Sequence, residues 1–485
     1  MNLASLLDLT AKARPDHPAV ETADERLTHA ETAARVRRLA GALARAGVGR
    51  ADPVGLCLGD HALHLLLHFA VARLGACIVP LDHRWAAPEK ARVAAAFRCR
   101  LVVHEEGDGA FASLPCLPAP ALAAEEADAP AEAQAEDLPV VLSLSSGTTG
   151  TPRGALVTHR QLYERFVSQW ATMSFHGGDR FLLATPLYFG GGRSFAMSFL
   201  VAGGTTILRP PPHAPLALVR AAAETRASVV FLVPTQLRRL LDDWQGDGPA
   251  FPGLRLLVSS GSALHADEKA RVLDRLTPNL MDYYASSEGG GIAVLPPWEQ
   301  RAFPGSVGRP TFRVEVEVTD AEGRPLPTGE TGLLRYRGPG VSSHLVEADG
   351  SLSEAPPGGW FAPGDLAQIL PGGHLVLRGR GKDMIIRGGV NIYPAEVEAA
   401  LLALPEVADC GVVGLPHAAL GQIVAAGVVL RRGAAATPES LSAALAGSLA
   451  PYRRPAVTAI LPELPKNSSG KTDKARLAAL LQAGS

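Results

Sequence analysis

The sequence predicts an α/β protein with more than one domain. Its 485 residues exceed the roughly 100–200 residues typical of a single domain. Hydrophobic residues make up 47% of the chain and charged residues 19%, a balance typical of folded chains. Fifty glycines and 39 prolines, with only 5% aromatic residues, indicate many tight connections between short elements. These features favour layers of helices and strands and exclude a single small module.

The first hundred residues alternate helical patterns with short apolar strands. Residues 36–46 carry apolar side chains at helical spacing, and strands are expected at 54–58, 77–80 and 101–103. This alternation is typical of βαβ units and predicts a parallel sheet. Residues 61–81 are the most apolar stretch, but they include His64, His68 and Arg73, so we expect a buried helix that leads into a strand.

The pattern changes four times further along the chain. Residues 119–137 are rich in Ala, Glu and Pro without any aromatic residue, and this composition predicts a solvated linker. From 138 to about 297 the alternation of strands and helices resumes as a second αβ unit. Short alternating runs between 313 and 377 predict antiparallel strands, and the remainder predicts a compact α+β segment with helices at 395–403 and 438–449.

Charge and cysteine content exclude several classes of protein. Lys and Arg number 46 and Asp and Glu 48, a formal net charge of −2, so no overall field favours nucleic acid or an anionic membrane. No apolar run reaches the roughly 20 uncharged residues of a membrane span. The five cysteines lack a Cys-x-x-Cys spacing and predict neither a disulfide framework nor a zinc site. We therefore expect a cytoplasmic protein that binds any anionic ligand at a local site.

A glycine-rich loop is the first candidate site. A strand at 140–144 leads into the sequence SSGTTGTPRG at 145–154. Its glycines let backbone amides approach a ligand, its hydroxyl groups add donors, and Arg153 supplies a positive fork, a combination suited to a polyphosphate. A Ser- and Thr-rich hairpin turn that binds no ligand is the alternative interpretation of the same composition.

Four further segments combine glycine with charged or hydroxyl residues. Each of YYASSEGGG (283–291) and GWFAPGD (359–365) places one carboxylate beside glycines, as a hard-cation ligand or a ribose acceptor would require, although a turn or a helix cap would do the same. Residues 379–398 form two glycine turns around a short apolar strand. Residues 464–474 hold three of the seven lysines in the chain, and Pro465 breaks the match to a P-loop.

Taken in order, these five segments resemble the core motifs of the adenylate-forming superfamily. That superfamily contains acyl- and aryl-CoA synthetases, peptide-synthetase adenylation domains and firefly luciferase. Residues 74–82 and 449–455 also match, so the resemblance covers nearly the whole chain. It implies a large N-terminal domain of two helix-flanked β-sheets plus a β-barrel, here residues 1–381. It also implies a small mobile α+β C-terminal domain, here residues 382–485.

The resemblance implies a role for residues that would contact ATP. Tyr284 would stack on adenine, Ser287 would contact the α-phosphate, and Glu288 would hold Mg²⁺. Asp365 and Arg380 would bind the ribose hydroxyls. The β- and γ-phosphates would be gripped by the glycine-rich loop, namely Ser145, Ser146, Gly147, Thr148, Thr149, Gly150 and Arg153.

The C-terminal residues would serve catalysis and domain rotation. By the same resemblance, Lys471 is the catalytic lysine and Lys382 is the hinge between the domains. Gly388 and Gly389 fall on the loop that lines the CoA pantetheine tunnel after rotation. A carboxylate that attacks the α-phosphate brings two anions together, so a lysine, a metal ion and phosphate-loop donors suit the transition state.

Four positions depart from the family pattern. Arg153 replaces a lysine but keeps the positive charge. Ala285 replaces a glycine after the tyrosine. Ala362 and Pro363 replace a basic residue followed by threonine, which removes polar groups beside Asp365.

The acid pocket is expected to have aromatic walls. Tyr188 and Phe189 lie in a segment that resembles one wall, with Phe189 where relatives often carry histidine, and Tyr283 and Ala285 would form the facing wall. No Asp is present in the first wall to bind an α-ammonium, which argues against amino acids. A malonate-type acid would require a cation near Tyr283, for which Arg193 is the only nearby candidate, and a solvated loop charge is the alternative interpretation of Arg193. We therefore expect an uncharged acid, short to medium aliphatic or small aryl.

The predicted activity is that of an AMP-forming acyl- or aryl-CoA synthetase that uses ATP, Mg²⁺ and CoA. An acyl-AMP ligase that loads a separate phosphopantetheinyl carrier protein is the first alternative, and a non-catalytic acyl-adenylate-binding protein is the second. No carrier domain follows Lys471, so we expect a separate acceptor, with free CoA preferred. The sequence leaves open whether the protein is a monomer or a homodimer.

Overall fold

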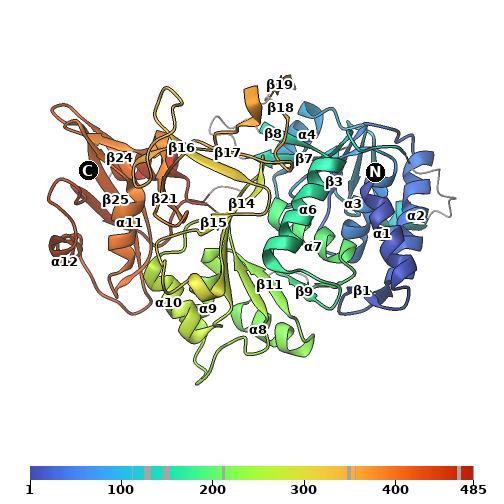
Figure 1. Cartoon of the computed structure of the whole chain (residues 1–485), viewed down its shortest axis with the longest axis horizontal. Helices are drawn as coiled ribbons and strands as arrows, with labels where there is room; N and C mark the ends of the chain where they lie inside the picture. Colours follow the sequence, from blue (N-terminus) through green and yellow to red (C-terminus); the bar gives the residue numbers. More distant parts are fainter. Residues whose placement is uncertain are drawn as a thin grey trace.

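The computed structural model describes residues 1–111, 113–124, 133–145, 153–209, 214–346, 351–354, 357–466 and 471–483. In this part of the chain, the strands form four sheets of nine, eight, four and five strands (Figure 1). The two large sheets and their helices make up one end of the molecule, and the five-stranded sheet lies at the other end (Figure 1). The predicted α/β class is confirmed.

The eight-stranded sheet has a parallel centre and an antiparallel edge. Its order is β19-β18-β8-β7-β4-β3-β5-β6, with parallel pairing from β7 to β6. The strands are β3 (Pro53–Cys57), β4 (Cys77–Pro80), β5 (Leu101–His104), β6 (Cys116–Pro118), β7 (Pro139–Ser145), β8 (Arg153–Thr158), β18 (His344–Val346) and β19 (Leu352–Glu354). The parallel sheet expected from the first hundred residues is thus confirmed.

The nine-stranded sheet combines strands from residues 18–28 with strands from residues 180–310. Its order is β15-β14-β13-β12-β11-β9-β10-β1-β2. The strands are β1 (Pro18–Glu21), β2 (Arg26–Thr28), β9 (Arg180–Leu183), β10 (Thr205–Leu208), β11 (Val229–Leu232), β12 (Leu256–Ser259), β13 (Leu280–Ser286), β14 (Gly290–Leu295) and β15 (Arg309–Pro310). Because β1 pairs with β10, the first residues of the chain complete a sheet built mainly from the second αβ unit.

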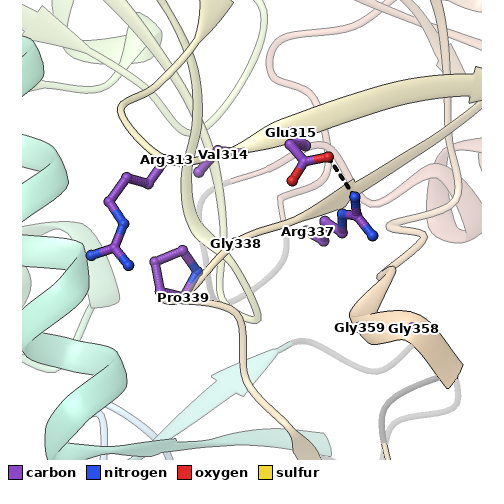
Figure 2. A pocket seen from close by; sticks show the side chains of 8 residues that line it. All are labelled: Arg313, Val314, Glu315, Arg337, Gly338, Pro339, Gly358 and Gly359. Atoms are coloured by element: carbon purple, nitrogen blue, oxygen red, sulfur yellow. Dashed lines mark hydrogen bonds and ion pairs between the residues drawn. The ribbon is translucent and has the colours of Figure 1, made fainter.

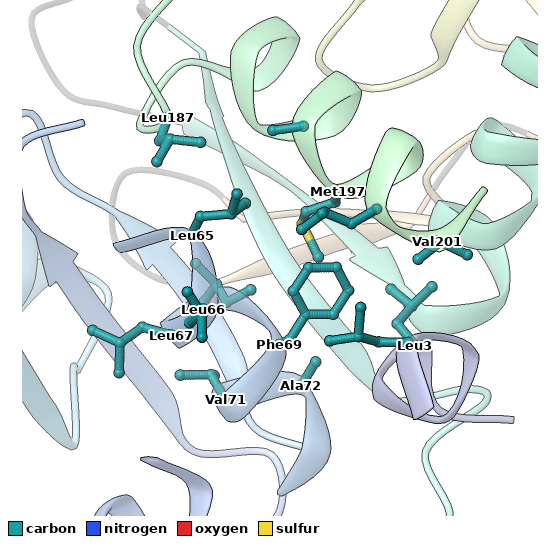
Figure 3. Packing of buried hydrophobic residues seen from close by; sticks show 14 of the residues in the cluster. Leu3, Leu65, Leu66, Leu67, Phe69, Val71, Ala72, Leu187, Met197 and Val201 are labelled. Carbon is teal, nitrogen blue, oxygen red and sulfur yellow. The ribbon is translucent and has the colours of Figure 1, made fainter. Parts of the chain in front are cut away.

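Helices cover the two large sheets and meet in a shared apolar core. They are α1 (Leu3–Ala13), α2 (His29–Arg45), α3 (Ala62–Arg73), α4 (Ala87–Ala96), α5 (Ala119–Ala124), α6 (His159–Met173), α7 (Gly190–Val201), α8 (Pro215–Glu224), α9 (Pro234–Asp243) and α10 (Ala266–Arg275). Figure 3 shows Leu3, Phe69 and Met197 of α1, α3 and α7 in contact at this core. The expected buried helix is α3, and no helix among the described residues is long and apolar enough to cross a membrane.

Two local expectations need correction. The helix expected from residue 36 begins at His29, because Thr28 and Glu31 form a capping box. The solvated linker expected at 119–137 is only partly correct for its described residues, several of which are exposed. Residues 119–124 form α5 with a buried Leu122, and Ala135 is also buried. Ala121, Ala123 and Ala124 of this helix are exposed, so the composition predicted their exposure but not the helix or its buried contacts.

The antiparallel strands expected between 313 and 377 are present, but they do not close into a barrel. They form an open sheet in the order β16-β17-β20-β21, with β16 (Glu315–Thr319), β17 (Thr331–Arg337), β20 (Asp365–Ile369) and β21 (Leu375–Arg380). Val318, Leu334 and Ala367 bury one face against Ala293 of β14. The expected β-barrel is therefore not found among the described residues, because four strands are too few to enclose a core and this sheet packs on a neighbour instead.

The remaining elements, which we call the C-terminal unit, have their own apolar core. This unit contains β22 (Ile385–Arg387), β23 (Val390–Ile392), α11 (Pro394–Leu402), β24 (Val407–His417), β25 (Gly421–Leu430), α12 (Pro438–Ala444), η5 (Leu445–Gly447), β26 (Val457–Ile460) and α13 (Lys474–Ala483). The helix expected at 438–449 ends at Ala444 and continues as a 3₁₀ turn. A second 3₁₀ turn, η4 (Gly381–Asp383), lies at the predicted domain boundary, which itself stays a prediction.

The five cysteines are free thiols, and four of them are buried. This agrees with the expectation that no disulfide framework stabilises the fold. The cytoplasmic location stays a prediction.

Candidate active site

The β13–β14 hairpin carries Glu288 at its turn. The amide of Gly289 donates to Oγ of Ser286 at 2.8 Å, which closes the turn, and Ser287 and Glu288 are half-buried. Three consecutive glycines follow because three buried side chains approach the backbone. A Cβ at position 289 would clash with the Tyr336 ring, one at 290 would lie 2.8 Å from Cδ of Arg165, and one at 291 would lie 2.5 Å from the Tyr283 hydroxyl.

Sheet register brings the predicted ribose-binding pair together. Asp365 of β20 lies opposite Arg380 of β21, and their side chains form an ion pair at 3.3 Å. The hydroxyl of Tyr284 donates to the second Asp365 oxygen at 2.5 Å. Burial and the nearby Asp365 carboxylate raise the pKa of Tyr284 well above its ordinary value, so this phenol stays a donor. Tyr284, Asp365 and Arg380 thus form one connected group.

Lys471 reaches the same group from the C-terminal unit. Desolvation lowers the pKa of its ammonium, the charge of Arg380 lowers it further, and Asp365 and Glu288 oppose both effects. Lys471 keeps an exposed surface, so neighbouring groups lie around this residue but leave part of it accessible to solvent. Residues from three different segments of the sequence therefore converge on one site.

The structure describes the two strands on either side of the predicted phosphate loop but not the loop itself. Ser146, Gly147, Thr148, Thr149 and Gly150 lie outside the described residues, as do the side chains of Ser145 and Arg153. The backbones of Ser145 and Arg153 face each other at the ends of β7 and β8, so the loop joins two paired strands.

An aromatic wall lies on the opposite face of β13 from Tyr284. The Tyr283 ring is 5.6 Å from Phe195, and Phe195 is 5.1 Å from Phe231, while Ala285 packs against the same core. A Cβ at Gly191 would lie 2.8 Å from Phe231 and 3.4 Å from Phe189. Phe189, Tyr283 and Ala285 of the predicted pocket therefore border one aromatic cluster.

Tyr188 contacts a different set of side chains. Arg84 donates to its hydroxyl and lies 5.1 Å above its ring, and His83 meets the ring edge. Asp82 holds Arg84 through two hydrogen bonds of 3.0 and 2.9 Å. The pocket role of Tyr188 stays a prediction.

Arg193 is buried, so the expectation of a solvated loop charge is wrong. Its exposed fraction is 5%, and it donates to the backbone oxygens of Leu187 and Tyr188 at 3.4 and 3.1 Å. Burial lowers its pKa to about 10, which still leaves it positively charged at neutral pH. The side chain holds the turn before α7 in place.

The predicted hinge and tunnel residues are exposed. Lys382 lies in η4. Gly388 and Gly389, both with positive φ, form the two-residue turn between β22 and β23, a conformation that favours glycine at both positions. The amide of Gly388 donates to Leu420 within the C-terminal unit at 2.8 Å.

An exposed ion pair joins the C-terminal unit to the large domain. Arg431, which follows β25, donates to Asp242 of α9 at 2.9 Å, and Arg271 of α10 lies 3.7 Å from the same carboxylate. Figure 1 shows α9 and α10 on the side of the large domain that faces this unit.

A surface hollow of about 540 Å³ lies apart from these residues (Figure 2). Arg313, Arg337 and the Gly358–Gly359 turn border it. Its charges are already compensated, because Arg337 pairs with Glu315 at 2.7 Å and Arg313 pairs with Glu164 at 2.6 Å. We therefore place the functional site at the converging residues and not in this hollow.

Sequence reasoning missed Arg165 and Tyr336, which support the Glu288 turn. A signal for Arg165 was available, because this charged residue falls on the same helical face as Leu162, Phe166 and Met173. Tyr336 sits among alternating apolar residues of β17, and nothing in that pattern distinguishes it from an ordinary core residue.

Comparison with known proteins agrees with this geometry. The family model described as "AMP-binding enzyme" matches residues 7–345, and the model "AMP-binding enzyme C-terminal domain" matches residues 396–471. A feruloyl-CoA synthase of Amycolatopsis sp is 33% identical over 95% of both chains. An indoleacetate–CoA ligase of Aromatoleum aromaticum is 30% identical over 98% of this chain and 97% of its own.

Solved structures of similar proteins superpose on nearly the whole of this chain. ATP-bound MatB from Rhodopseudomonas palustris superposes with a TM-score of 0.90 at 28% identity, with 99% of each chain covered. Apo MatB, at the same identity and coverage, superposes with a TM-score of 0.79. The chain therefore superposes better on the ATP-bound form of this neighbour than on its apo form.

The family models, the relatives and the converging residues agree, and the chain belongs to the AMP-binding enzyme family. Its activity is that of an ATP-dependent, AMP-forming acid–CoA ligase, with ATP, Mg²⁺ and CoA as cofactors and cosubstrates.

Proposed function

We propose that this ligase activates an uncharged carboxylic acid of limited length, short to medium aliphatic or small aryl. The aromatic wall of Phe189, Phe195, Phe231 and Tyr283 carries this proposal, since such walls favour flat or apolar ligands. The two relatives named for feruloyl and indoleacetate substrates support an aryl acid.

The buried cations near this wall also favour an uncharged acid. The Arg193 contacts are backbone carbonyls, and the three nitrogens of Arg165 donate to three further carbonyls. Both side chains thus serve the fold. The methyl of Ala285, where the family pattern has glycine, shortens the space available to an acyl chain.

The nucleotide is proposed to bind across the converging residues. Asp365 and Arg380 would hold the ribose hydroxyls, and Tyr284 would stack on adenine with its hydroxyl fixed by Asp365. Ser287 would contact the α-phosphate, and the loop that starts at Ser145 would hold the β- and γ-phosphates.

A magnesium ion fits this site as a companion of ATP. The described residues contain no cluster of three or more His, Cys, Asp or Glu able to hold a metal, so Glu288 stands as a single carboxylate ligand. Mg²⁺ in nucleotide enzymes takes one or two carboxylates and completes its shell with phosphates and water. Bound in that way, it would neutralise charge on the phosphates.

In the first step, a carboxylate oxygen of the acid forms a bond to the α-phosphorus of ATP, and pyrophosphate leaves with the broken phosphoanhydride bond. The ammonium of Lys471 is proposed to stabilise the charge that develops between the two anions. Its position beside Asp365 and Glu288 supports this role.

In the second step, the CoA sulfur attacks the acyl carbonyl carbon, the thiol proton is lost, and AMP leaves. We propose that the C-terminal unit rotates about Lys382, so that Gly388 and Gly389 line the pantetheine path. A phosphopantetheinyl carrier protein presents the same thiol and is the alternative acceptor.

A panel of carboxylic acids tests this function. AMP and thioester formation are measured with CoA, with a phosphopantetheinyl carrier protein and with neither. We expect the highest kcat/KM for small aryl or short aliphatic acids with CoA, and Ala285→Gly should extend the range to longer acids. The pocket assignment is wrong if a long-chain fatty acid is the best substrate of the unmodified enzyme. CoA is not the acceptor if the thioester forms on the carrier protein alone.

A further inference from the structure

The Arg165 side chain crosses from α6 to the turn that carries Glu288. Only 9% of this residue is exposed. Its Nε donates to the carbonyl of Gly340 at 2.8 Å, and its two terminal nitrogens donate to the carbonyls of Ser287 and Glu288 at 3.2 and 2.6 Å. The Glu288 carbonyl also accepts from the amide of Ser342 at 2.8 Å. The backbone on both sides of the Glu288 side chain is therefore tied to the interior.

Two glycines make room for this connection. A Cβ at Gly290 would lie 2.8 Å from Cδ of Arg165, and a Cβ at Gly340 would lie 2.9 Å from its Cγ. The adjoining cavity measures about 10 Å³, which is room for no more than a single water. Arg165 therefore acts on the backbone around it and has no space beside it for a substrate group.

The chemistry of the side chain suits this task. Burial lowers the pKa of Arg165, while Tyr336, Tyr283 and Glu288 oppose that effect, and a guanidinium stays charged under such conditions. Its planar group offers donors in three directions, whereas a lysine would supply one compact charge on a flexible stem. Charged donors to carbonyls are among the stronger hydrogen bonds in proteins.

We propose that Arg165 is a positioning residue that sets the Glu288 carboxylate for Mg²⁺ during adenylation. The inference rests on the proposed role of Glu288. Groups that orient a metal ligand commonly change metal affinity or activity by about 10–100-fold when altered. The effect should therefore appear in the magnesium dependence of the first half-reaction.

The test is a titration of free Mg²⁺, followed both as acid-dependent ATP–pyrophosphate exchange and as calorimetric binding of Mg²⁺ to the enzyme with a nonhydrolysable ATP analogue. Arg165→Lys should raise the half-saturating Mg²⁺ concentration about 10-fold or more, with activity recovered at high Mg²⁺. Thioester formation from supplied acyl-adenylate should change less than about twofold, because that step breaks no phosphoanhydride bond. Arg160→Lys is the matched control, since Arg160 lies on the same helix but is exposed and pairs with Glu136 and Asp137.

Two further variants separate the possible failures. Gly340→Ala pushes on the Arg165 stem without removing its charge and should shift the Mg²⁺ dependence in the same direction by a smaller factor, which keeps the test valid should Arg165→Lys not fold. If Glu288→Gln shifts the Mg²⁺ dependence while Arg165→Lys and Gly340→Ala leave it unchanged, the positioning role is wrong. If Glu288→Gln leaves it unchanged, the proposed metal ligand itself is wrong.

Discussion

Glu288 and Lys471 meet at one site, but the protein holds them in different ways. The Glu288 turn belongs to the large domain, where a buried guanidinium and three tightly packed glycines fix its backbone. Lys471 belongs to the C-terminal unit, which contacts the large domain through Arg378 and Glu396 at 3.9 Å and through the Arg431–Asp242 pair. The side chains of that pair remain 29% and 46% exposed.

The difference in burial implies a difference in strength. A hydrogen bond from a charged donor contributes about 1.5–3 kcal/mol, whereas an exposed ion pair contributes about 0.2–1 kcal/mol and weakens with salt. The Glu288 side of the site is therefore the fixed half, and the Lys471 side is the half that can move away. An enzyme that first adenylates the acid and then transfers the acyl group to a thiol needs both a fixed half and a movable half of the site.

Removal of the Lys471 charge should have the largest effect. Lys471→Ala should lower acid-dependent ATP–pyrophosphate exchange by roughly 10²–10³, the loss typical of deleting one group that stabilises transition-state charge. Thioester formation from supplied acyl-adenylate should be affected far less, because the movable half has then left the site. An equal loss in both half-reactions would contradict this division.

A rigid hinge should separate the two halves of the reaction. Lys382 lies in the 3₁₀ turn η4, whose φ range of about −50° to −70° already suits proline. Lys382→Pro should therefore retain the present arrangement, keep pyrophosphate exchange within a few-fold, and reduce thioester formation by more than about tenfold. Rates of the two half-reactions are measured on the folded variant, with Lys382→Ala as control. If Lys382→Pro slows both half-reactions to the same extent, or slows neither of them, residue 382 is not the hinge.

The lowered pKa of Lys471 predicts a limit at alkaline pH. The ammonium form is required, so adenylation should fall about tenfold per pH unit above the pKa of Lys471, which lies below its ordinary value of 10.5. Lys471→Arg keeps its charge at these pH values and should lack this decline, however low its rate. Single-turnover rates against pH, with unfolding followed in parallel, make the comparison. The same alkaline decline in both proteins would assign it to another group.

The smallest effect is expected from the exposed pair. Arg431→Glu should weaken docking of the C-terminal unit and lower pyrophosphate exchange by no more than about fivefold, in keeping with an exposed ion pair. Asp242→Lys combined with Arg431→Glu should restore most of the rate, and 0.5 M salt should reduce the difference. Failure of the double variant to recover would show that charge complementarity does not hold the unit in place.

The sequence predicted β3, β4, β5 and β7, because each is a short apolar run between turn residues. It did not predict that β1 and β2 would join the sheet formed by the second αβ unit, since pairing between distant strands leaves no local pattern. The barrel expected from resemblance is not found among the described residues for a related reason. Packing of Val318 and Leu334 on Ala293 is a tertiary contact.

The site shows the same division between local pattern and tertiary contact. Motif order was enough to name Tyr284, Asp365 and Arg380, which the sheet register brings together. Arg165 was missed because its partners are backbone carbonyls more than a hundred residues away, and any residue type can supply a carbonyl. Buried Arg193 was misjudged because its partners are also backbone carbonyls, although they lie only five and six residues away.

A reversible crosslink tests the fixed and movable halves most directly. Cysteines placed at Asp242 and Arg431 can be joined by a short cleavable bis-maleimide, with the unmodified chain treated in parallel to account for its own thiols. The crosslinked protein should keep acid-dependent pyrophosphate exchange near the uncrosslinked rate and lose most thioester formation, and cleavage should restore it. Thioester formation at the full rate while the crosslink is intact would contradict the account, because the second step would then need no movement of the C-terminal unit.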